Sequence, residues 1–586
     1  MEMLNIKING KDYQVPAGST VLEAARAAHV DIPTLCYLKD INEIGACRLC
    51  LVEVAEMRGP QLGPYRMVTA CVYPVTEGMN VITNSDKIRK SRKLNLELVL
   101  SNHNRTCLSC NRSTTCELQK LCQEYGVEET HFSGQKTPTA IDDSSVSIIR
   151  DNSKCILCRR CVAACKEMQG IGVIGSLNRG FDTVIGSAFD KELASTSCVN
   201  CGQCIVACPV GALYERDDTA KVFEALGDPE KHVVICTAPS VRATLGECFG
   251  YEPGTDVEGK MVSALKALGF DGVFDMNTTA DLTIMEEAYE FLDRFQNGGK
   301  LPLITSCSPG WVKYCEHYFP EFTENLSTCK SPQQMFGALV KTYYAQKKGL
   351  DPKNIFMVSA IPCTAKKFEV GRDGEAAAGV PDVDVALTTR ELGRMIQTAG
   401  IQFRELEDSM YDDAFGIGTG AGAIFGATGG VMEAALRTAA EVVLGKPLEK
   451  VEFTDVRGPE KIRYATYKLG EVELKVAVAS GTKNAKELLN KVKSGEVDVQ
   501  FIEIMACPGG CVNGGGQPTQ PASVRNNVDL VAKRSAVLYN ADENKLAFRK
   551  SHENPVVKAL YEEFLEKPNS HKAHELLHTH YVKRGL

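Results

Sequence analysis

The sequence predicts a multidomain protein with α+β modules in its N-terminal part and an α/β domain after them. Three observations support this fold class. The chain has 586 residues, which is room for about three to five domains at roughly 100–200 residues per domain. Most of its 24 cysteines lie before about residue 217. Beyond that point apolar runs alternate with helical stretches, which indicates α/β architecture.

The first 30 residues predict a β-hairpin followed by a helix. Apolar and polar side chains alternate over 4–8 and 13–15, on either side of Asn9-Gly10, and this dipeptide favours a tight hairpin turn. Thr20 followed by Glu23 forms a capping box that opens a helix through VLEAARAAH.

The first cysteine group predicts a 2Fe–2S cluster. Its spacing resembles the pattern of plant-type ferredoxins, with a tight central pair and distant outer ligands, and it consists of Cys36, Cys47, Cys50 and Cys71. Four thiolates suit iron because soft sulfur ligands stabilise it. A zinc site is the alternative, but it would favour two close pairs. Residues 1–79 are therefore expected to form a β-grasp 2Fe–2S ferredoxin module.

A second group follows an amphipathic helix over 88–100 and predicts a 4Fe–4S cluster within 80–142. Its members are His103, Cys107, Cys110 and Cys116. The three cysteines are close enough to hold one face of a cubane, with His103 as the fourth ligand. A neutral imidazole in place of a thiolate should raise the reduction potential of the cluster. In the alternative, His103 is a solvated loop residue and Cys122 is the ligand.

The third group has the most specific spacing and predicts a bacterial two-cluster ferredoxin module over 143–216. In such modules the fourth cysteine of each run binds the other cluster. One 4Fe–4S cluster is assigned to Cys155, Cys158, Cys161 and Cys208, and the other to Cys198, Cys201, Cys204 and Cys165. A paired zinc ribbon is the alternative. Such modules carry electrons and do no bond chemistry.

The α/β domain is expected over 217–548, followed by a charged helical segment over 549–586. Apolar runs over 232–240, 300–307, 354–363 and 498–507 predict its strands, and several of them end in a cysteine. The carboxyl ends of strands are where α/β folds place their sites. A fourth, scattered group stands there or just beyond: Cys307, Cys363, Cys507 and Cys511. Spacing alone leaves open that these are buried structural cysteines.

Three segments resemble the signature segments of the FeFe hydrogenases: TSCSPGW from Thr305, PCTAKKFE from Pro362 and EIMACPGGCVNGGGQP from Glu503. The resemblance covers essentially the whole chain, since the accessory modules precede these segments in the family's order and the C-terminal segment is similar to the family's small subunit. It implies one 2Fe–2S cluster, three accessory 4Fe–4S clusters and an H-cluster, a cubane bridged to a diiron unit that carries CO and cyanide.

Carried over by motif, Cys363, Cys507 and Cys511 are ligands of the cubane, with Cys511 as the bridge to the diiron unit. Lys366 would hydrogen-bond a cyanide, as a cation should with a buried anionic ligand. Two further positions are implied to line the pocket: Phe425, and Ile361 where the family usually has methionine.

The first signature departs from the family, which usually has TSCCPGW. There the first cysteine relays protons and the second ligates the cubane, but here the second is Ser308. Three ligation schemes remain open, through the oxygen of Ser308, through Cys307 or through Cys329.

The resemblance also implies a proton route. Glu287, Glu290 and Arg294 fall at helical spacing on roughly one face, and they match the family's relay together with Ser327 and then Cys307. Without the resemblance, these charges would be a solvated helix face.

One further motif is rejected as a nucleotide site. GTGAGA over 418–423 fits a dinucleotide pattern, but no buried strand is predicted before it. By the resemblance this loop lines the H-cluster pocket.

We therefore expect a cytoplasmic enzyme that reversibly oxidises H2. The first 215 or so residues also resemble the large iron–sulfur subunit of respiratory complex I, so an electron-transfer subunit is one alternative; a hydrogen sensor is another. Expected partners are a flavin- and NAD(P)-binding iron–sulfur subunit, a small thioredoxin-like 2Fe–2S subunit and ferredoxin, with stand-alone ferredoxin-linked activity as the alternative. The net charge of −8 disfavours nucleic acid, and no run predicts a membrane span.

Overall fold

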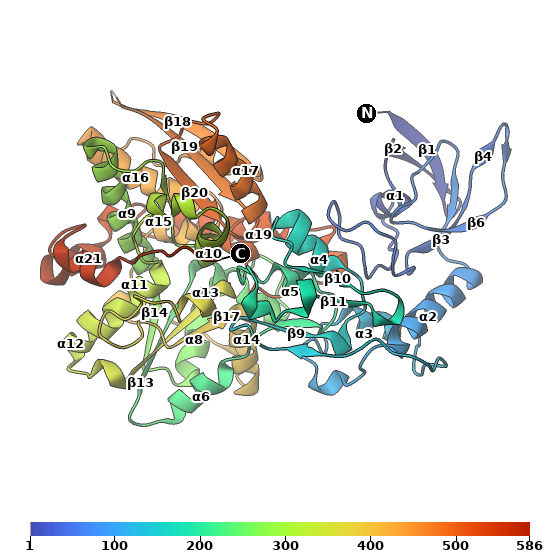
Figure 1. The fold of residues 1–586 in the computed structure, drawn as a ribbon, viewed down its shortest axis with the longest axis horizontal. Helices are drawn as coiled ribbons and strands as arrows, with labels where there is room; N and C mark the ends of the chain where they lie inside the picture. Colours follow the sequence, from blue (N-terminus) through green and yellow to red (C-terminus); the bar gives the residue numbers. More distant parts are fainter. Residues whose placement is uncertain (1, 471, 586) are drawn as a thin grey trace.

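The computed structural model describes residues 2–470 and 472–585, and its N-terminal module stands apart at one end of the molecule (Figure 1). The predicted hairpin and capped helix are confirmed as β1 (Met3–Ile8), β2 (Lys11–Pro16) and α1 (Val21–Ala27). A mixed sheet of order β2-β1-β7-β3-β6 is completed by β7 (Asn80–Ile82), β3 (Leu51–Ala55) and β6 (Arg66–Thr69). Its apolar side packs on α1, as in a β-grasp fold.

The middle of the chain lies between this module and the C-terminal half (Figure 1). The predicted amphipathic helix is α2 (Asp86–Ser101), and α3 (Glu117–Glu124) follows the second cysteine group. A three-stranded sheet of order β12-β9-β8 then carries two short helices that pack on each other. Their bounds are α4 (Arg160–Ala163) and α5 (Gln203–Ala207), and the strands are β8 (Ile141–Asp142), β9 (Ile148–Asp151) and β12 (Leu213–Glu215).

Two four-stranded sheets form the C-terminal half, which confirms the expected α/β architecture. The first is parallel throughout, with the order β14-β13-β16-β17; its strands are β14 (Gly272–Asp275), β13 (His232–Thr237), β16 (Ile355–Ile361) and β17 (Val385–Thr388). The second has the order β15-β20-β19-β18, with only β18 antiparallel; its strands are β15 (Leu303–Ile304), β20 (Phe501–Met505), β19 (Val472–Ser480) and β18 (Ile462–Leu469).

Helix α9 (Asn277–Asn297) stands between the two sheets. It packs against α11 (Pro332–Leu339) and α16 (Gly430–Leu444). Leu282 belongs to the apolar core around the first sheet, whereas Ile284 belongs to the core around the second. Because both sides of the helix are covered, polar residues as far along it as Glu290 are buried as well. None of the helices within the described residues is long and apolar enough to cross a membrane.

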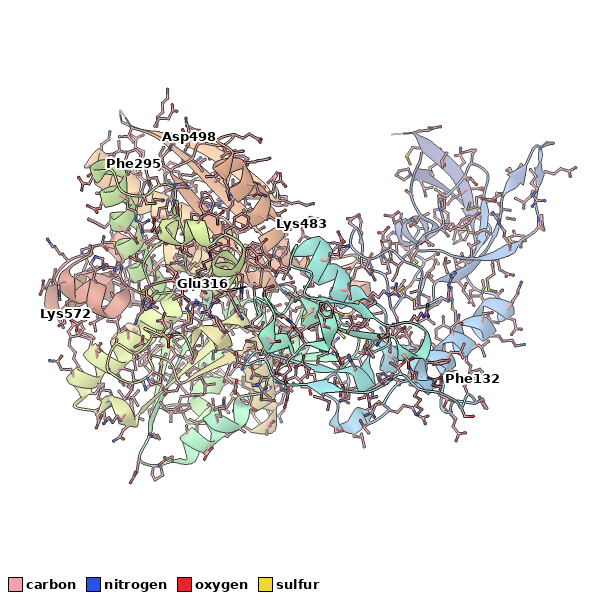
Figure 2. The ribbon with its side chains drawn as sticks, in the orientation of Figure 1. Phe132, Phe295, Glu316, Lys483, Asp498 and Lys572 are labelled. Carbon is pink, nitrogen blue, oxygen red and sulfur yellow. The ribbon has the colours of Figure 1, made fainter. Side chains whose placement is uncertain are left out.

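The C-terminal segment is helical only in part. It contains α20 (Pro555–Leu560) and α21 (His571–Leu577), but residues 578–585 are not helical, so the expectation of a helix there was wrong. These residues bond to other segments instead of to the preceding turn. The Thr579 N–H donates to the Thr328 carbonyl at 2.7 Å and the Arg584 N–H to the Glu316 carbonyl at 2.9 Å. Figure 2 shows Glu316 near the middle of the molecule, where the chain ends in Figure 1.

Candidate metal centre and proton route

A deep cavity lies at the carboxyl ends of strands from both sheets. Cys363 follows β16, Cys507 follows β20 and Cys307 follows β15, as the position of sites in α/β folds predicts. The empty space in and around the cavity, open solvent at its mouth included, amounts to roughly 820 Å³. Its lining includes all four cysteines of the scattered group, the expected pocket residues and one accessory cysteine: Cys307, Cys363, Cys507, Cys511, Ser308, Ile361, Lys366, Phe425 and Cys201.

The chemistry of this lining suits an iron–sulfur group. Burial raises the pKa of the Cys511 thiol to about 12, and the pKa of Cys363 is raised by burial as well. Several buried thiols around one space are soft donors that lose their protons to a thiophilic metal. Gly510 has φ +97°, and a Cβ on it would lie 2.7 Å from the Thr428 nitrogen. Glycine at this position therefore keeps the Cys507–Cys511 loop close to the cavity.

Ser308 and Cys329 differ in where the structure places them. Ser308 lines the cavity and starts α10 (Pro309–Tyr318), and its Oγ accepts a hydrogen bond from the Ala506 N–H at 3.2 Å. Cys329 does not line the cavity, and its Sγ lies 3.6 Å from Oε2 of Glu290. The ligation scheme through Cys329 therefore has no geometric support.

Lys366 is a buried cation at the cavity wall. Its Nζ donates to Oε2 of Glu369 at 2.7 Å, and the same carboxylate oxygen accepts from Ser331 Oγ and Gln333 Nε2. This network fixes the ammonium group while leaving donor capacity toward the cavity, because an ammonium carries three protons. Sequence reasoning missed Glu369, although its position three residues after Lys366 in PCTAKKFE places it on the same helical face.

The predicted proton-route residues form a polar line on and beside α9. Arg294 Nη2 lies 2.5 Å from Glu290 Oε1, and Ser327 Oγ donates to Glu290 Oε2 at 2.9 Å. Burial, followed by the negative charge of Glu290, raises the pKa of Glu287 to about 8, and a hydrogen bond between Glu287 and Ser327 opposes this. Burial and the charge of Glu287 raise the pKa of Cys307.

This line does not lie on a solvated helix face. Glu287 is 1% and Glu290 8% exposed. The line runs from Arg294, whose side chain is 14% exposed, to Cys307 at the cavity.

Both accessory cysteine sets of the two-cluster module converge as their spacing predicts. Each set lines a separate cavity, one with Cys155, Cys158, Cys161 and Cys208, and the other with Cys165, Cys198, Cys201 and Cys204. The fourth cysteine of each run thus joins the other run. Cys201 lines both its own cavity and the large one, so these two sites are neighbours.

The remaining two groups lie toward the N-terminal module. The Cys47 N–H donates to Cys36 Sγ at 3.5 Å, and the sulfurs of Cys50 and Cys71 are 3.3 Å apart. Nδ1 of His103 is buried without a hydrogen-bond partner among the described residues. Burial lowers the pKa of His103, which favours the neutral form that binds metals.

Cys122 lies beside the second group. Its thiol is buried and close to Cys116, and burial with that neighbouring charge raises its pKa to about 11. The structure thus places Cys122 beside this group, whereas the support for His103 is its buried imidazole without a hydrogen-bond partner among the described residues.

The glycines of GTGAGA serve helix packing. A Cβ on Gly422 would lie 2.6 Å from the carbonyl oxygen of Asn277 on α9, and a Cβ on Gly420 would collide with Asp542. The Thr419 hydroxyl donates to Asp281 at 2.6 Å. The residues just before the loop form no strand, so the sequence-based rejection of a dinucleotide site has a structural reason.

Family models match the chain in the order of its modules. They are a 2Fe–2S iron–sulfur cluster binding domain over 1–86, an NADH-ubiquinone oxidoreductase-G iron–sulfur binding region over 92–131 and an NADH-quinone oxidoreductase subunit 3 ferredoxin-like domain over 145–214. Two more models follow, the C-terminal domain of the iron only hydrogenase large subunit over 231–515 and the iron hydrogenase small subunit over 528–584.

Individual relatives extend over the whole chain. It is 49% identical to the NADP-reducing hydrogenase subunit HndD of Solidesulfovibrio fructosivorans, with all of both chains covered. It is 44% identical to iron hydrogenase 1 of Clostridium pasteurianum, covering 99% of this chain and 100% of the relative. A variant of the [FeFe]-hydrogenase HydA1 from Chlamydomonas reinhardtii superposes with a TM-score of 0.57 at 40% identity, covering 63% of this chain and 100% of that one. The chain therefore belongs to the FeFe (iron-only) hydrogenases, a family of enzymes.

Proposed function

We propose that the chain catalyses the reversible oxidation of H2 to protons and electrons at an H-cluster held in the cavity between the two sheets. One observation carries this function. The buried line that begins at Arg294 reaches the cavity at Cys307, and the accessory site that contains Cys201 reaches the same cavity at Cys201. A hydrogenase needs this junction because protons and electrons must both reach one buried centre.

Cys363, Cys507 and Cys511 would hold the H-cluster, with Cys511 as the bridge and Ser308 as the favoured fourth ligand. When bound, this group supplies the redox chemistry of hydrogen, which no side chain can perform. Lys366 would bind an anionic ligand of the group, since its ammonium is fixed at the wall. Ile361 and Phe425 would keep water out of the apolar space between them.

Protons would pass between Cys307 and the surface along the buried line. Glu287 holds its carboxyl proton near neutral pH because its pKa is raised to about 8. The Ser327 hydroxyl, bonded to Glu290, joins the two carboxyl groups, and Arg294 marks the solvent end. Cys307 would then be the last carrier, which favours Ser308 over Cys307 as the fourth ligand.

Electrons would travel through three 4Fe–4S clusters to the 2Fe–2S cluster of the N-terminal module. We place the modules at 1–79, 80–142, 143–216, 217–548 and 549–586. The site that contains Cys201 adjoins the large cavity, which supports electron transfer from the H-cluster to that site. The interleaving of the two cysteine sets supports the next transfer, between their two clusters.

The electrons would leave for a flavin- and NAD(P)-binding iron–sulfur subunit and a small thioredoxin-like 2Fe–2S subunit in the cytoplasm. The matches of the accessory modules to NADH oxidoreductase families support this, as does the full-length relative named as a subunit of an NADP-reducing hydrogenase. Ferredoxin is the alternative acceptor.

The partner proposal is tested with the matured chain alone. It should exchange electrons between H2 and viologen dyes but reduce no NAD or NADP until the flavin subunit is added. Nicotinamide reduction by the isolated chain would overturn the partner assignment, as would full activity with ferredoxin alone.

Ser308 favours one second candidate, a hydrogen sensor, because an oxygen ligand changes the donor set of the site. A sensor would bind H2 but turn it over slowly. Rapid viologen reduction by the wild-type chain, matched by a Ser308→Cys variant, would exclude this role.

A further inference from the structure

We propose that the C-terminal segment supplies a second proton branch to Glu290, in which His578 exchanges a proton with that carboxylate through the hydroxyl of Thr328. The branch rests on the proposed function, because Glu290 is the outer carboxylate of the proton route. It would assign a relay role to a segment otherwise explained as packing around the catalytic domain.

The Thr328 hydroxyl bridges the two titratable groups. Its Oγ1 lies 3.2 Å from Glu290 Oε1 and 2.7 Å from His578 Nδ1. The other ring nitrogen, Nε2, lies 3.2 Å from Glu286 Oε2. One atom each from Glu290, Cys329 and His578 lie within 4.8 Å of one another. A single hydroxyl is therefore the shortest link between the imidazole and the proton route.

This geometry supports a proton transfer in which nothing is oxidised or reduced. In the His578 cation, Nδ1–H donates to Thr328 Oγ1 while the threonine O–H donates to Glu290 Oε1. Transfer moves the Nδ1 proton to the threonine oxygen and the threonine proton to Glu290. The imidazole is left neutral with its proton on Nε2, the hydroxyl is restored, and Glu290 becomes a carboxylic acid. The reverse transfer carries protons outward during H2 oxidation.

Glu286 orients the imidazole from the side away from Thr328. It is fully buried, and its carboxylate accepts from the Tyr561 hydroxyl at 2.5 Å and from the Asn569 N–H at 2.8 Å. These bonds hold the carboxylate fixed, so Nδ1 of His578 stays directed at Thr328. Glu286 and Glu290, four residues apart on α9, thus serve the same ring, the first directly and the second through Thr328.

The branch reaches the surface through α21. The ring of His574 lies 4.0 Å from that of His578, centre to centre, and His574 is exposed. Figure 2 shows Lys572 of the same helix at the outer edge of the molecule. The ionisable groups that face His578 are Glu286 and Glu290 on α9, Cys329 on the opposing loop and His574 on the preceding helix α21.

A packing role alone does not require the Thr328 hydroxyl. The backbone already ties the two segments together, since the Thr579 N–H donates to the Thr328 carbonyl at 2.7 Å and the Lys330 N–H to the Leu577 carbonyl at 2.8 Å. Replacing the hydroxyl by a methyl group keeps the shape of the side chain, so Thr328→Val separates the relay from the packing. Thr328→Ser keeps the hydroxyl and is the matched rescue.

The test compares Thr328→Val, Thr328→Ser and His578→Gln with the wild-type matured protein, and His571→Gln on the exposed start of α21 serves as the control. Infrared difference spectra between acidic and alkaline buffer record the C=O stretch of protonated Glu290, and this measurement needs no hydrogen turnover. We expect Thr328→Val and His578→Gln to shift the pH at which this band titrates, and Thr328→Ser and His571→Gln to leave it in place. The same two variants should lower H2 evolution from reduced viologen by about tenfold.

Unchanged carboxyl titration and unchanged turnover in both Thr328→Val and His578→Gln would overturn the branch. Equal losses in Thr328→Ser and Thr328→Val would do so too, because the hydroxyl would then not matter. Failure of the proposed function would look different, since the wild type itself would show no H2 turnover while the carboxyl band still responded to Thr328→Val.

Discussion

Replacing Glu287 by glutamine removes a buried carboxyl group near Cys307 whose pKa is raised by burial. With a pKa of about 8, this carboxyl keeps its proton about nine-tenths of the time at about pH 7, whereas an ordinary glutamate would keep it well under about 1% of the time. Glutamine has nearly the same shape but no proton to give. Positioned acid–base groups contribute about a hundredfold to ten-thousandfold to rate, so we expect a loss of turnover of at least about a hundredfold.

The assay is H2 evolution from reduced viologen, measured from about pH 5 to about pH 9 and normalised to the infrared bands of the bound group. Wild-type turnover should fall as the pH rises through about 8, because Glu287 then loses its proton. Asp293→Asn is the matched control, since Asp293 is exposed near the end of the same helix. If Glu287→Gln keeps its infrared bands and more than about a tenth of the turnover, the assignment of Glu287 to the proton route is refuted.

Three further substitutions test other parts of the site. Cys307→Ala should leave the iron content near normal and nearly abolish turnover; loss of the H-cluster bands would instead make Cys307 the ligand. Ser308→Cys should fold, keep the cluster and shift its reduction potential, because thiolate and alkoxide differ in softness; an unchanged potential and unchanged bands would show that Ser308 does not touch iron. Arg437→Met should lower the thermal unfolding midpoint, because it leaves buried Glu433 and Asp542 short of a partner, at a cost of about 3 kcal/mol; an unchanged midpoint would contradict this.

Short-range sequence patterns were sufficient to predict the helices and strands named here. The Asn9-Gly10 hairpin and the Thr20 capping box form where alternation and capping predict them, and the strands before Cys363 and Cys507 form where apolar runs predict them. The interleaved cysteine runs also converge as expected, because their spacing is set by the short helices between them.

Long-range contacts could not be predicted in the same way. The sequence left Cys329 open as a ligand, and only the packing of its loop on α9 shows that its thiol faces Glu290. The end of the chain is not helical because it pairs with Thr328 and Glu316, some 250 or more residues away. For the same reason nothing local identified His578, whose partners Thr328 and Glu286 come from two other segments.

Infrared spectroscopy of the matured protein tests the central claim most directly. If Cys363, Cys507 and Cys511 hold an H-cluster in the cavity, the spectrum contains bands from metal-bound CO and cyanide, and Cys511→Ala loses them while the accessory clusters remain. A matured protein with its full complement of accessory iron but without CO and cyanide bands would contradict the account.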